Sequence, residues 1–177
     1  MTTENKSAQQ NNPNQNQRRR GFRNRRRNRD SDEFSLIENV IKIRRVSKTV
    51  KGGRNLSFNA MVAVGDGAGK VGIALASASA VPDAVQRAVQ YAKNKMVEIN
   101  LNNTTLPHEG VYKFGSSKVM LKPAAPGTGL IAGGGVRAVL EAVGVKDVVS
   151  KTFGSTNAIN VVYALSLIHI WRCRRAI

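Results

Sequence analysis

Arginine and lysine side chains are the groups in this sequence best suited to chemistry, and that chemistry is the binding of phosphate. A guanidinium group donates paired hydrogen bonds to a phosphate, and a dense run of such groups releases counterions from a polyanion. A run of this kind lies near the N-terminus and consists of Arg18, Arg19, Arg20, Arg23, Arg25, Arg26, Arg27 and Arg29. This run predicts a contact with nucleic acid, and a solubilising tail is the alternative.

A second group of basic residues surrounds a pair of glycines. Glycine backbone lets a phosphate approach its N–H groups closely, and the cations and hydroxyls around it supply charge and hydrogen bonds. The candidate residues are Arg44, Arg45, Ser47, Lys48, Thr49, Lys51, Gly52, Gly53 and Arg54, with Lys70 farther along the chain. An exposed hairpin whose charges are merely solvated is the alternative.

Residues suited to catalysis are sparse. His108 lies between Pro107 and Glu109, without a cysteine partner or a spacing typical of metal ligands. The acidic residues are scattered among basic ones and form no evident pair for acid–base catalysis. We therefore expect no enzyme, no metal site and no cofactor.

Two glycine-rich strings offer a nucleotide-binding alternative. The string from Gly67 to Gly72 fits G-x-G-x-x-G, but it lies between two expected strands and so lacks the helix N-terminus that would hold a pyrophosphate. The string that begins at Gly127 lies between a strand and a helix, with Asp147 twenty residues farther on. A dinucleotide site needs a strand that ends at such an acidic residue, whereas Asp147 is expected to begin its strand. Both strings are therefore interpreted as turns or loops.

Composition narrows the classes of protein further. The chain has 177 residues and a net charge of +17, from 28 basic and 11 acidic residues, and 41% of its residues are hydrophobic. This is enough apolar surface for one or two small domains. No apolar run approaches the roughly 20 residues of a membrane span, and the N-terminus does not resemble a signal peptide. With a single cysteine, the chain is expected in the reducing cytoplasm, without a membrane partner.

Composition also divides the chain into segments. Residues 1–33 are expected to form a disordered basic tail, because they offer almost no apolar surface. Residues 34–99 are expected to form a first domain, 100–108 a linker and 109–164 a second domain.

Hydrophobic periodicity places the secondary structure within these segments. In the first domain it predicts strands at 38–50, 56–64 and 70–76, a turn around Gly52 and Gly53, and a helix from Pro82 towards Met96. In the second it predicts strands at 116–123 and 147–153, a glycine-rich loop at 127–135 and a helix at 136–143 that ends at Gly144. A last helix is expected from residue 158, with Asn157 as a possible cap.

Motifs along residues 34–164 resemble the family of bacterial small-subunit ribosomal protein five. In the first half these are Arg45-Val46-Ser47-Lys48-Thr49-Val50-Lys51-Gly52-Gly53-Arg54, Val64-Gly65-Asp66-Gly67 and Gly69-Lys70-Val71-Gly72. In the second half they include Leu106-Pro107-His108-Glu109, Gly127-Thr128-Gly129, Arg137-Ala138-Val139-Leu140-Glu141 and Gly154-Ser155-Thr156-Asn157.

This resemblance implies an α+β fold. Its N-terminal domain would be similar to double-stranded RNA-binding domains, with a three-stranded antiparallel sheet and a helix, and its C-terminal domain would be a two-layer α/β domain. It also implies a structural constituent of the small ribosomal subunit that binds the subunit's RNA through the basic hairpin. Such a protein would lie near the channel through which mRNA enters and would influence assembly, decoding accuracy and spectinomycin sensitivity.

The resemblance further implies partners. Members of this family contact the neighbouring small-subunit proteins four and eight, and Gly129 and Arg137 are expected at the interface with protein four. A free-standing binder of duplex RNA and a nucleotide-dependent enzyme are the alternatives from other functional classes.

Two segments depart from the family pattern. Before the first helix, Ala76-Ser77-Ala78-Ser79-Ala80-Val81 stands where the family carries two cations, which puts RNA contact at that turn in doubt. After Ala164 the sequence reads Leu165-Ser166-Leu167-Ile168-His169-Ile170-Trp171-Arg172-Cys173-Arg174-Arg175. That string is similar, codon by codon, to a transposon-end sequencing adapter translated with TGA as tryptophan. Residues 165–177 are therefore interpreted as non-native, and a lineage-specific basic tail is the alternative.

Deletion of residues 1–30 tests the proposed role of the arginine run. If these arginines neutralise phosphates, the deletion will flatten the dependence of ribosomal RNA affinity on salt, because fewer counterions are released on binding. Affinity measured by filter binding over a salt series gives this slope. An unchanged slope would show that the tail makes no phosphate contacts.

Overall fold

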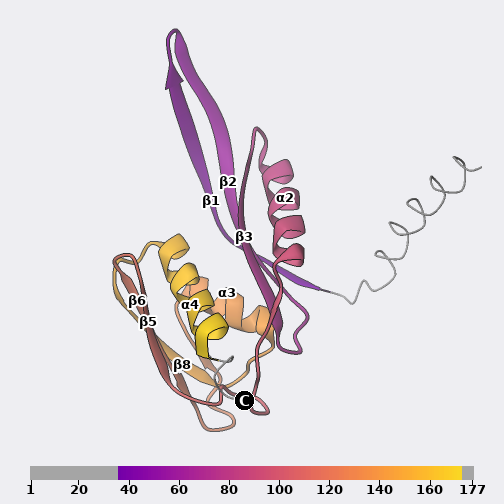
Figure 1. Cartoon of the computed structure of the whole chain (residues 1–177), viewed down its shortest axis with the longest axis vertical. Coiled ribbons are helices and arrows are strands. Elements are labelled where there is room, and N and C mark those ends of the chain that lie inside the picture. The colour runs from indigo at the N-terminus through magenta and orange to yellow at the C-terminus, as the bar shows by residue number, and fades with distance from the viewer. Residues whose placement is uncertain (1–35, 173–177) are drawn as a thin grey trace, which may run out of the picture. The chain divides into compact units, whose positions relative to one another are not determined.

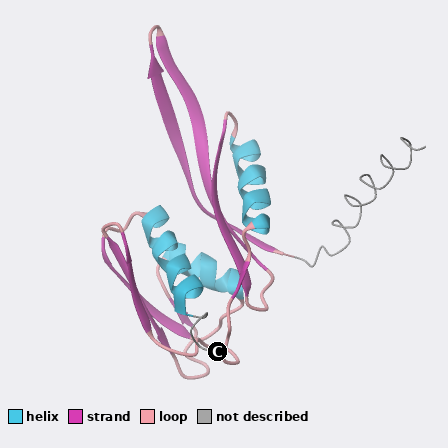
Figure 2. Cartoon of the chain, in the orientation of Figure 1, coloured by secondary structure: helices cyan, strands magenta, loops and turns pink. Residues whose placement is uncertain are grey.

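The computed structural model describes residues 36–172, with side chains up to Ser166. The predicted basic tail at 1–33 and residues 173–177 lie outside the described residues. The described part contains two four-stranded sheets and three helices (Figures 1 and 2). The expected α+β class is confirmed.

The first sheet is antiparallel and has the order β1-β2-β3-β4. Its strands are β1 (Ile37–Val50), β2 (Gly53–Gly65), β3 (Lys70–Ala78) and β4 (Val97–Glu98). The first three strands were predicted, whereas β4 was not, so the expected three-stranded sheet was one strand short. At two residues, β4 is too short to show the alternation from which strands are recognised.

Helix α2 (Val81–Asn94) covers one face of this sheet. Alanines at 84, 88 and 92 are fully buried on the helix face that packs against Val62 and Val64 of β2 and their neighbours. Small side chains bring the helix so close that a Cβ at Gly72 would overlap the carbonyl oxygen of Ala92. Pro82 occupies the first turn as predicted, but the helix ends before Met96.

The second sheet is mixed, with the order β5-β6-β8-β7. It comprises β5 (Gly110–Phe114), β6 (Ser117–Pro123), β7 (Leu130–Ile131) and β8 (Val148–Gly154), with β7 parallel to β8. Strands β6 and β8 were predicted to within one residue at each end, but β5 and β7 were missed. The two-residue β7 lies inside the stretch interpreted as a loop.

Helices α3 (Gly134–Val143) and α4 (Ala158–Arg172) complete the second half. Helix α3 begins two residues earlier than predicted and ends as predicted at Gly144, whose φ of 91° suits a left-handed C-cap. Asn157 precedes α4, and its side-chain oxygen accepts a hydrogen bond from the Arg44 guanidinium. Helix α4 packs against β5 and β6, where Phe114 and Tyr163 have ring centroids 5.4 Å apart.

The two halves share one hydrophobic core. On the sheet face opposite α2, Met61 and Ala63 join a buried cluster that includes Leu140 of α3 and Leu121 of β6. Ile99 and Leu106, at the ends of the expected linker, are buried in the same cluster. The segment between the halves is therefore packed against both of them.

A backbone junction reinforces this shared core. The N–H groups of Gly67 and Gly69, in the β2–β3 turn, donate to the carbonyl oxygens of Ala142 (3.1 Å) and Val143 (3.0 Å) at the end of α3. Such carbonyls have no partner within their own helix. A Cβ at Gly144 would overlap the Gly67 carbonyl oxygen, so glycine permits this approach.

We predict that Gly144→Ala lowers the free energy of unfolding by about 2–4 kcal/mol, because it combines a left-handed φ with an overlap against backbone. Gly134→Ala is the control: a Cβ there meets nothing within 4 Å, and alanine favours a helix, so stability is expected to stay level or rise slightly. Urea unfolding followed by circular dichroism measures both. Equal stabilities of the two variants would contradict the prediction.

Candidate nucleic-acid interface

The hairpin of β1 and β2 extends beyond the rest of the first sheet. Strand β3 pairs with β2 only as far as Phe58, opposite Ala78. From there to the turn at Lys51 and Gly52, β1 and β2 form a two-stranded ribbon (Figure 1). We call residues 44–58 the basic ribbon. It carries all but one of the residues of the folded part that were predicted to bind RNA.

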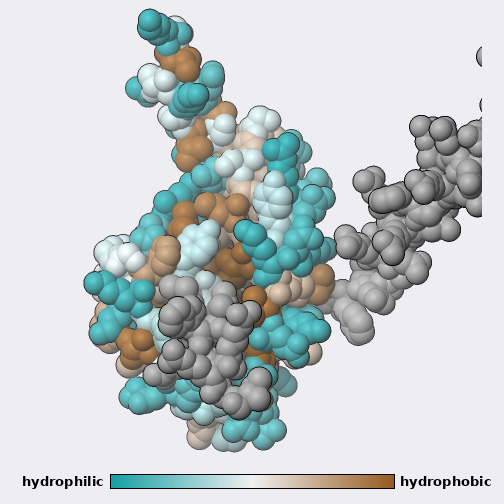
Figure 3. All heavy atoms as spheres, viewed as in Figure 1, coloured by the Kyte–Doolittle hydropathy of each residue, from teal (hydrophilic) through white to brown (hydrophobic). Residues whose placement is uncertain are grey.

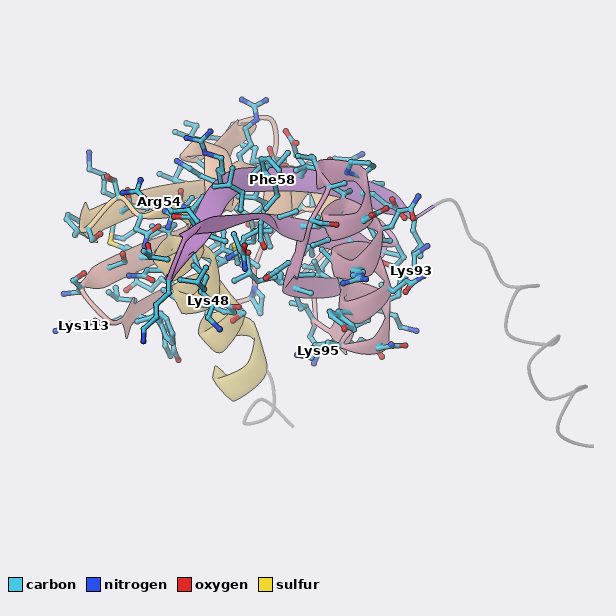
Figure 4. The ribbon with its side chains drawn as sticks, turned by 90° about the horizontal axis from the view of Figure 1, so that it is seen from above. Lys48, Arg54, Phe58, Lys93, Lys95 and Lys113 are labelled. Atoms are coloured by element: carbon cyan, nitrogen blue, oxygen red, sulfur yellow. The ribbon has the colours of Figure 1, made fainter. Side chains whose placement is uncertain are left out.

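Pairing in the basic ribbon sorts these candidates onto two faces. Arg45 lies opposite Phe58, Ser47 opposite Leu56 and Thr49 opposite Arg54, so these side chains share the face on which α2 packs lower in the sheet. The other face carries Arg44, opposite Asn59, and Lys48, opposite Asn55. Lys48 and Arg54 accordingly project from opposite sides of the ribbon (Figure 4). A partner could be held from both sides.

Positive charge on the basic ribbon is not balanced within it. Residues 44–58 include five lysines or arginines and no acidic residue. The side chains of Arg45, Lys48, Lys51 and Arg54 are exposed. Arg44 is the exception, because it is partly buried and donates to Asn157. Arg44 therefore links the two halves of the chain, in addition to any contact with a ligand.

The two turn glycines differ in what the fold demands of them. Gly52 has a φ of 95°, a conformation that other residues rarely adopt. Gly53 has no positive φ, and a Cβ there would meet nothing within 4 Å. The chain itself gives no reason for glycine at 53, whereas a close external partner would.

Apolar side chains are interleaved with the cations of the basic ribbon. Val46 is 38% exposed, Val50 40% and Leu56 53%. Hydrophobic and hydrophilic surface alternate along the projecting part of the molecule (Figure 3). The ribbon thus offers apolar contact as well as charge, a combination typical of surfaces that bind a partner.

Lys70 does not belong with the basic ribbon. It begins β3, next to the β2–β3 turn, at the end of the sheet opposite the hairpin turn. Its side chain is exposed, and Glu98 lies opposite it in β4. The structure therefore separates Lys70 from the other candidates.

The first glycine-rich string is a turn, as predicted, and its N–H groups are occupied. Ala68 and Lys70 donate from backbone nitrogen to the Asp66 carboxylate (2.8 and 2.9 Å), while Gly67 and Gly69 donate to α3. No N–H group from residue 67 to residue 70 remains for a phosphate.

The second glycine-rich string is organised by Asp147. This carboxylate is almost fully buried and accepts hydrogen bonds from the backbone N–H groups of Gly127 and Gly129, both at 3.0 Å. The N–H of Gly129, the hydroxyl of Thr104 and the N–H of Gly127 lower the pKa of Asp147, against the opposing effect of burial. Asp147 immediately precedes β8, as expected. The loop is therefore held by its own carboxylate instead of presenting these donors to a pyrophosphate.

The two residues expected at a protein interface lie at either side of α3's start. Gly129 is half-buried with a φ of 77°, and a Cβ there would meet nothing within 4 Å. Arg137 is exposed on α3 and forms an ion pair with Glu141 at 2.8 Å. Both are accessible, and their role remains a prediction.

The turn within residues 76–81, where the family's two cations are missing, still has a positively charged side chain beside it. It lies between β3 and α2, and the Arg87 guanidinium reaches back from α2 to the carbonyl oxygen of Ser77 (3.4 Å). A cation from a different sequence position therefore stands beside the turn.

Other classes of site find no support in the part of the chain that the structure describes. Within residues 36–172, no group of three or more His, Cys, Asp or Glu side chains is placed to hold a metal ion. Among the same residues, no helix has the length and apolar character needed to cross a bilayer.

Comparison with known proteins identifies the family to which the chain belongs. The model of the ribosomal protein S5 N-terminal domain matches residues 36–100, and that of the C-terminal domain matches residues 112–166. The chain is 53% identical over 133 residues to small ribosomal subunit protein uS5 of Chloroflexus aurantiacus, a match that covers 75% of each chain. It is 50% identical over 135 residues to the protein of the same name from Syntrophobacter fumaroxidans, covering 76% of this chain and 81% of the relative.

This chain belongs to the ribosomal protein S5 family. The resemblance read from the sequence motifs is confirmed, and so is the expectation of a structural, non-enzymatic protein, because the family is of that kind. The family match ends at residue 166, and the adapter interpretation of residues 165–177 stays a prediction. The fully buried Leu165 belongs to the core, and α4 continues through Arg172.

Some features of the candidate interface were missed from the sequence. Leu56 and Phe58 share a ribbon face with Arg45 and Arg54, which follows only from the pairing register. From the sequence, Asp147 was considered only as the acidic residue of a dinucleotide site, whereas it accepts hydrogen bonds from the backbone of its own chain. A buried aspartate twenty residues from a glycine pair leaves no local signal of this contact.

We predict that Asp147→Ala lowers the urea midpoint at pH 7 and that Asp147→Asn lowers it less, because the amide oxygen can still accept both N–H bonds. Since folding lowers the pKa of Asp147, its charge stabilises the fold above the unfolded-state pKa. That contribution is lost as pH falls through the folded-state pKa. The gap between wild type and Asp147→Ala should therefore narrow between about pH 5 and pH 2. A gap that stays constant with pH would contradict the role of the charge.

Proposed function

We propose that this chain is a structural constituent of the small ribosomal subunit in the cytoplasm and that its basic ribbon binds the subunit's RNA. The observation that carries the proposal is a projecting hairpin with five cations and no acidic residue, in a chain of the ribosomal protein S5 family. Phosphate contacts of lysine and arginine dominate such binding and position the protein on the RNA.

The geometry of the basic ribbon suits a structured RNA. Its two faces carry Arg45 and Arg54 on one side and Lys48 on the other, so two phosphate strands could be contacted at once. Gly53 would let a phosphate or ribose approach the backbone without a side chain in between. Ser47 and Thr49 add hydroxyl groups that can donate to phosphate or to the 2′-hydroxyl of ribose.

The finer assignments extend the same proposal. In the assembled subunit, the protein would lie near the channel through which mRNA enters and would affect decoding accuracy through the RNA that the basic ribbon holds. Gly129 and Arg137 would face the neighbouring small-subunit protein four, and protein eight would be a second neighbour. The exposure of Arg137 supports a contact at this point.

Of the alternatives, a nucleotide-dependent enzyme is disfavoured because the N–H groups of residues 67–70 and 127–129 donate within the chain. A free-standing binder of duplex RNA would need only the first half. The core shared by both halves favours a protein that acts as one body. Cosedimentation with small subunits in high-salt gradients distinguishes a free-standing RNA binder from a constituent of the subunit.

The double variant Lys48→Gln/Arg54→Gln tests the basic ribbon. We expect the slope of log affinity against log salt, measured with purified small-subunit ribosomal RNA, to fall by about 1.5, because two phosphate contacts are lost. The matched control is Lys95→Gln/Lys146→Gln, which removes two exposed charges elsewhere and should leave the slope near that of the wild type. Equal slopes for the two variants would exclude the basic ribbon as the RNA contact.

Gly53→Ala provides an independent test. A Cβ at this position meets no described residue within 4 Å, so the free energy of unfolding should stay within about 0.5 kcal/mol of wild type. A partner that touches the backbone would be pushed away, and RNA affinity should fall several-fold. Unchanged affinity would show that the partner does not approach the ribbon at this glycine.

A further inference from the structure

Side chains of β1 tie this strand to the second half of the chain at two points, both on the sheet face opposite α2. The side-chain amide of Asn39 donates to the carbonyl oxygen of Ala138 in α3 at 2.9 Å. The Arg44 guanidinium donates to the side-chain oxygen of Asn157, the residue that precedes α4. Because Arg44 begins the basic ribbon, this second tie connects the ribbon to α4.

The tie made by Arg44 leaves a buried acceptor without a partner. Asn59 lies directly opposite Arg44 in the pairing of β1 with β2, so both side chains project from the same face. The Oδ1 atom of Asn59 is buried and accepts no hydrogen bond from the residues that the structure describes. Such an oxygen destabilises the fold, because it has lost water without gaining a donor.

The same tie occupies the residue that was expected to cap α4. Asparagine caps a helix by accepting a hydrogen bond from a backbone N–H of the first turn. In this structure the side-chain oxygen of Asn157 takes its hydrogen bond from Arg44. The first N–H groups of α4, which have no partner within their own helix, are therefore left without this cap.

A second arrangement of the same three side chains would satisfy all of these groups. Residues directly opposite each other in an antiparallel pair have Cβ atoms about 5 Å apart, so the long side chain of Arg44 can turn to Asn59 Oδ1. Asn157 would then be free to cap α4. The cost of this arrangement is the hydrogen bond between the two halves.

A bound phosphate favours the second arrangement. Arg44 and Lys48 project from the same face of the basic ribbon, so an RNA strand held by Lys48 brings phosphate oxygens close to Arg44. A guanidinium binds an anionic phosphate more strongly than the neutral amide oxygen of Asn157. With five N–H groups, Arg44 can donate to a phosphate and to Asn59 at the same time.

We propose that Arg44 is a latch between the basic ribbon and α4. In the free chain it holds Asn157; when the ribbon binds RNA, it turns to Asn59 and the phosphate, and Asn157 caps α4. Opening is local, since Asn39 and the shared core still hold β1 to the second half. The latch rests on the proposed function for the ligand that opens it, whereas the two arrangements are properties of the chain alone.

Hydrogen exchange at the first turn of α4 reports the state of the latch, because a capped N–H exchanges more slowly than an uncapped one. The N–H groups of Ile159 and Asn160 are the ones that a cap at residue 157 reaches. In the wild-type chain, purified small-subunit ribosomal RNA should slow exchange at these two residues several-fold. Mass spectrometry of overlapping peptides measures this rate, with exchange in α3 as the internal reference for loss of fold.

Arg44→Ala opens the latch without RNA. Asn157 then caps α4 in the free chain, so exchange at the first turn should be several-fold slower than in wild type and should change little when RNA is added. Asn39→Ala is the matched control, because it removes the other side-chain tie of β1 but leaves Asn157 bound to Arg44. Its exchange at α4 should equal that of wild type. Exchange in Arg44→Ala as fast as in wild type would overturn the latch.

Asn59→Leu removes the second partner of Arg44 and keeps the latch closed. The urea midpoint should stay level or rise, because an apolar group of similar shape replaces a buried oxygen that has no donor. RNA should slow exchange at the first turn of α4 less than in wild type. Asn55→Leu, at an exposed position on the same face, should leave the response to RNA unchanged. A full response to RNA in Asn59→Leu would show that Asn59 is not the second partner.

The outcomes distinguish this inference from the proposed function. If RNA binds the ribbon but exchange at the start of α4 does not respond in the wild-type chain, the latch is overturned and the function stands. If the chain binds no ribosomal RNA, the function is overturned and RNA does not open the latch. The comparison of Arg44→Ala with wild type in the absence of RNA then still decides whether the two arrangements exist.

Discussion

The contact on which the rest of the structure depends is made by backbone alone, between the β2–β3 turn and the end of α3. Gly67 and Gly69 donate to the last carbonyl oxygens of the helix, and Gly144 leaves room for the Gly67 carbonyl. The hydrogen bonds satisfy groups that would otherwise be buried without partners. A side chain at Gly144 would overlap the Gly67 carbonyl oxygen and force the turn and the helix end apart. The two sheets are held together as one body at this point.

This junction explains how a basic hairpin can serve as a positioned binding element. The sheet from which the basic ribbon projects is fixed by α2 on one face and by the shared core on the other. Arg44, at the base of the ribbon, is tied to Asn157 in the second half. Among the residues that the structure describes, the cations nearer the turn have no such partner, so they are available to phosphates. Along β1 and β2, from the body of the sheet towards the hairpin turn, side chains become less packed and more positive charge becomes available to a ligand.

The glycine-rich strings show how similar patterns can have different uses. In a phosphate loop, glycine N–H groups point at a ligand. Here the carboxylates of Asp66 and Asp147 each accept hydrogen bonds from two backbone N–H groups, and two carbonyl oxygens at the end of α3 accept two more. The lowered pKa of Asp147 follows from these donors, which favour its charged form. Glycine at these positions allows close packing within the protein, whereas Gly53 has no such internal reason.

Sequence by itself determined the family, the α+β class, most strands and the ribbon that carries the cations. These features depend on local periodicity, on turn residues and on contiguous motifs, all of which are properties of neighbouring residues. Strands β4 and β7 were missed because two residues show no alternation, and β5 was missed although Val111, Tyr112 and Phe114 are residues typical of strands.

Only the tertiary structure decided which side chains share a face. Cross-strand register separated Lys48 from Arg54, moved Lys70 to the other end of the sheet and placed Lys113, Lys118 and Phe153 in one row. Contacts between residues far apart in the chain, such as Asp147 with Gly127, depend on how the elements pack. A single sequence records the residues of such a contact, but not the distance between them.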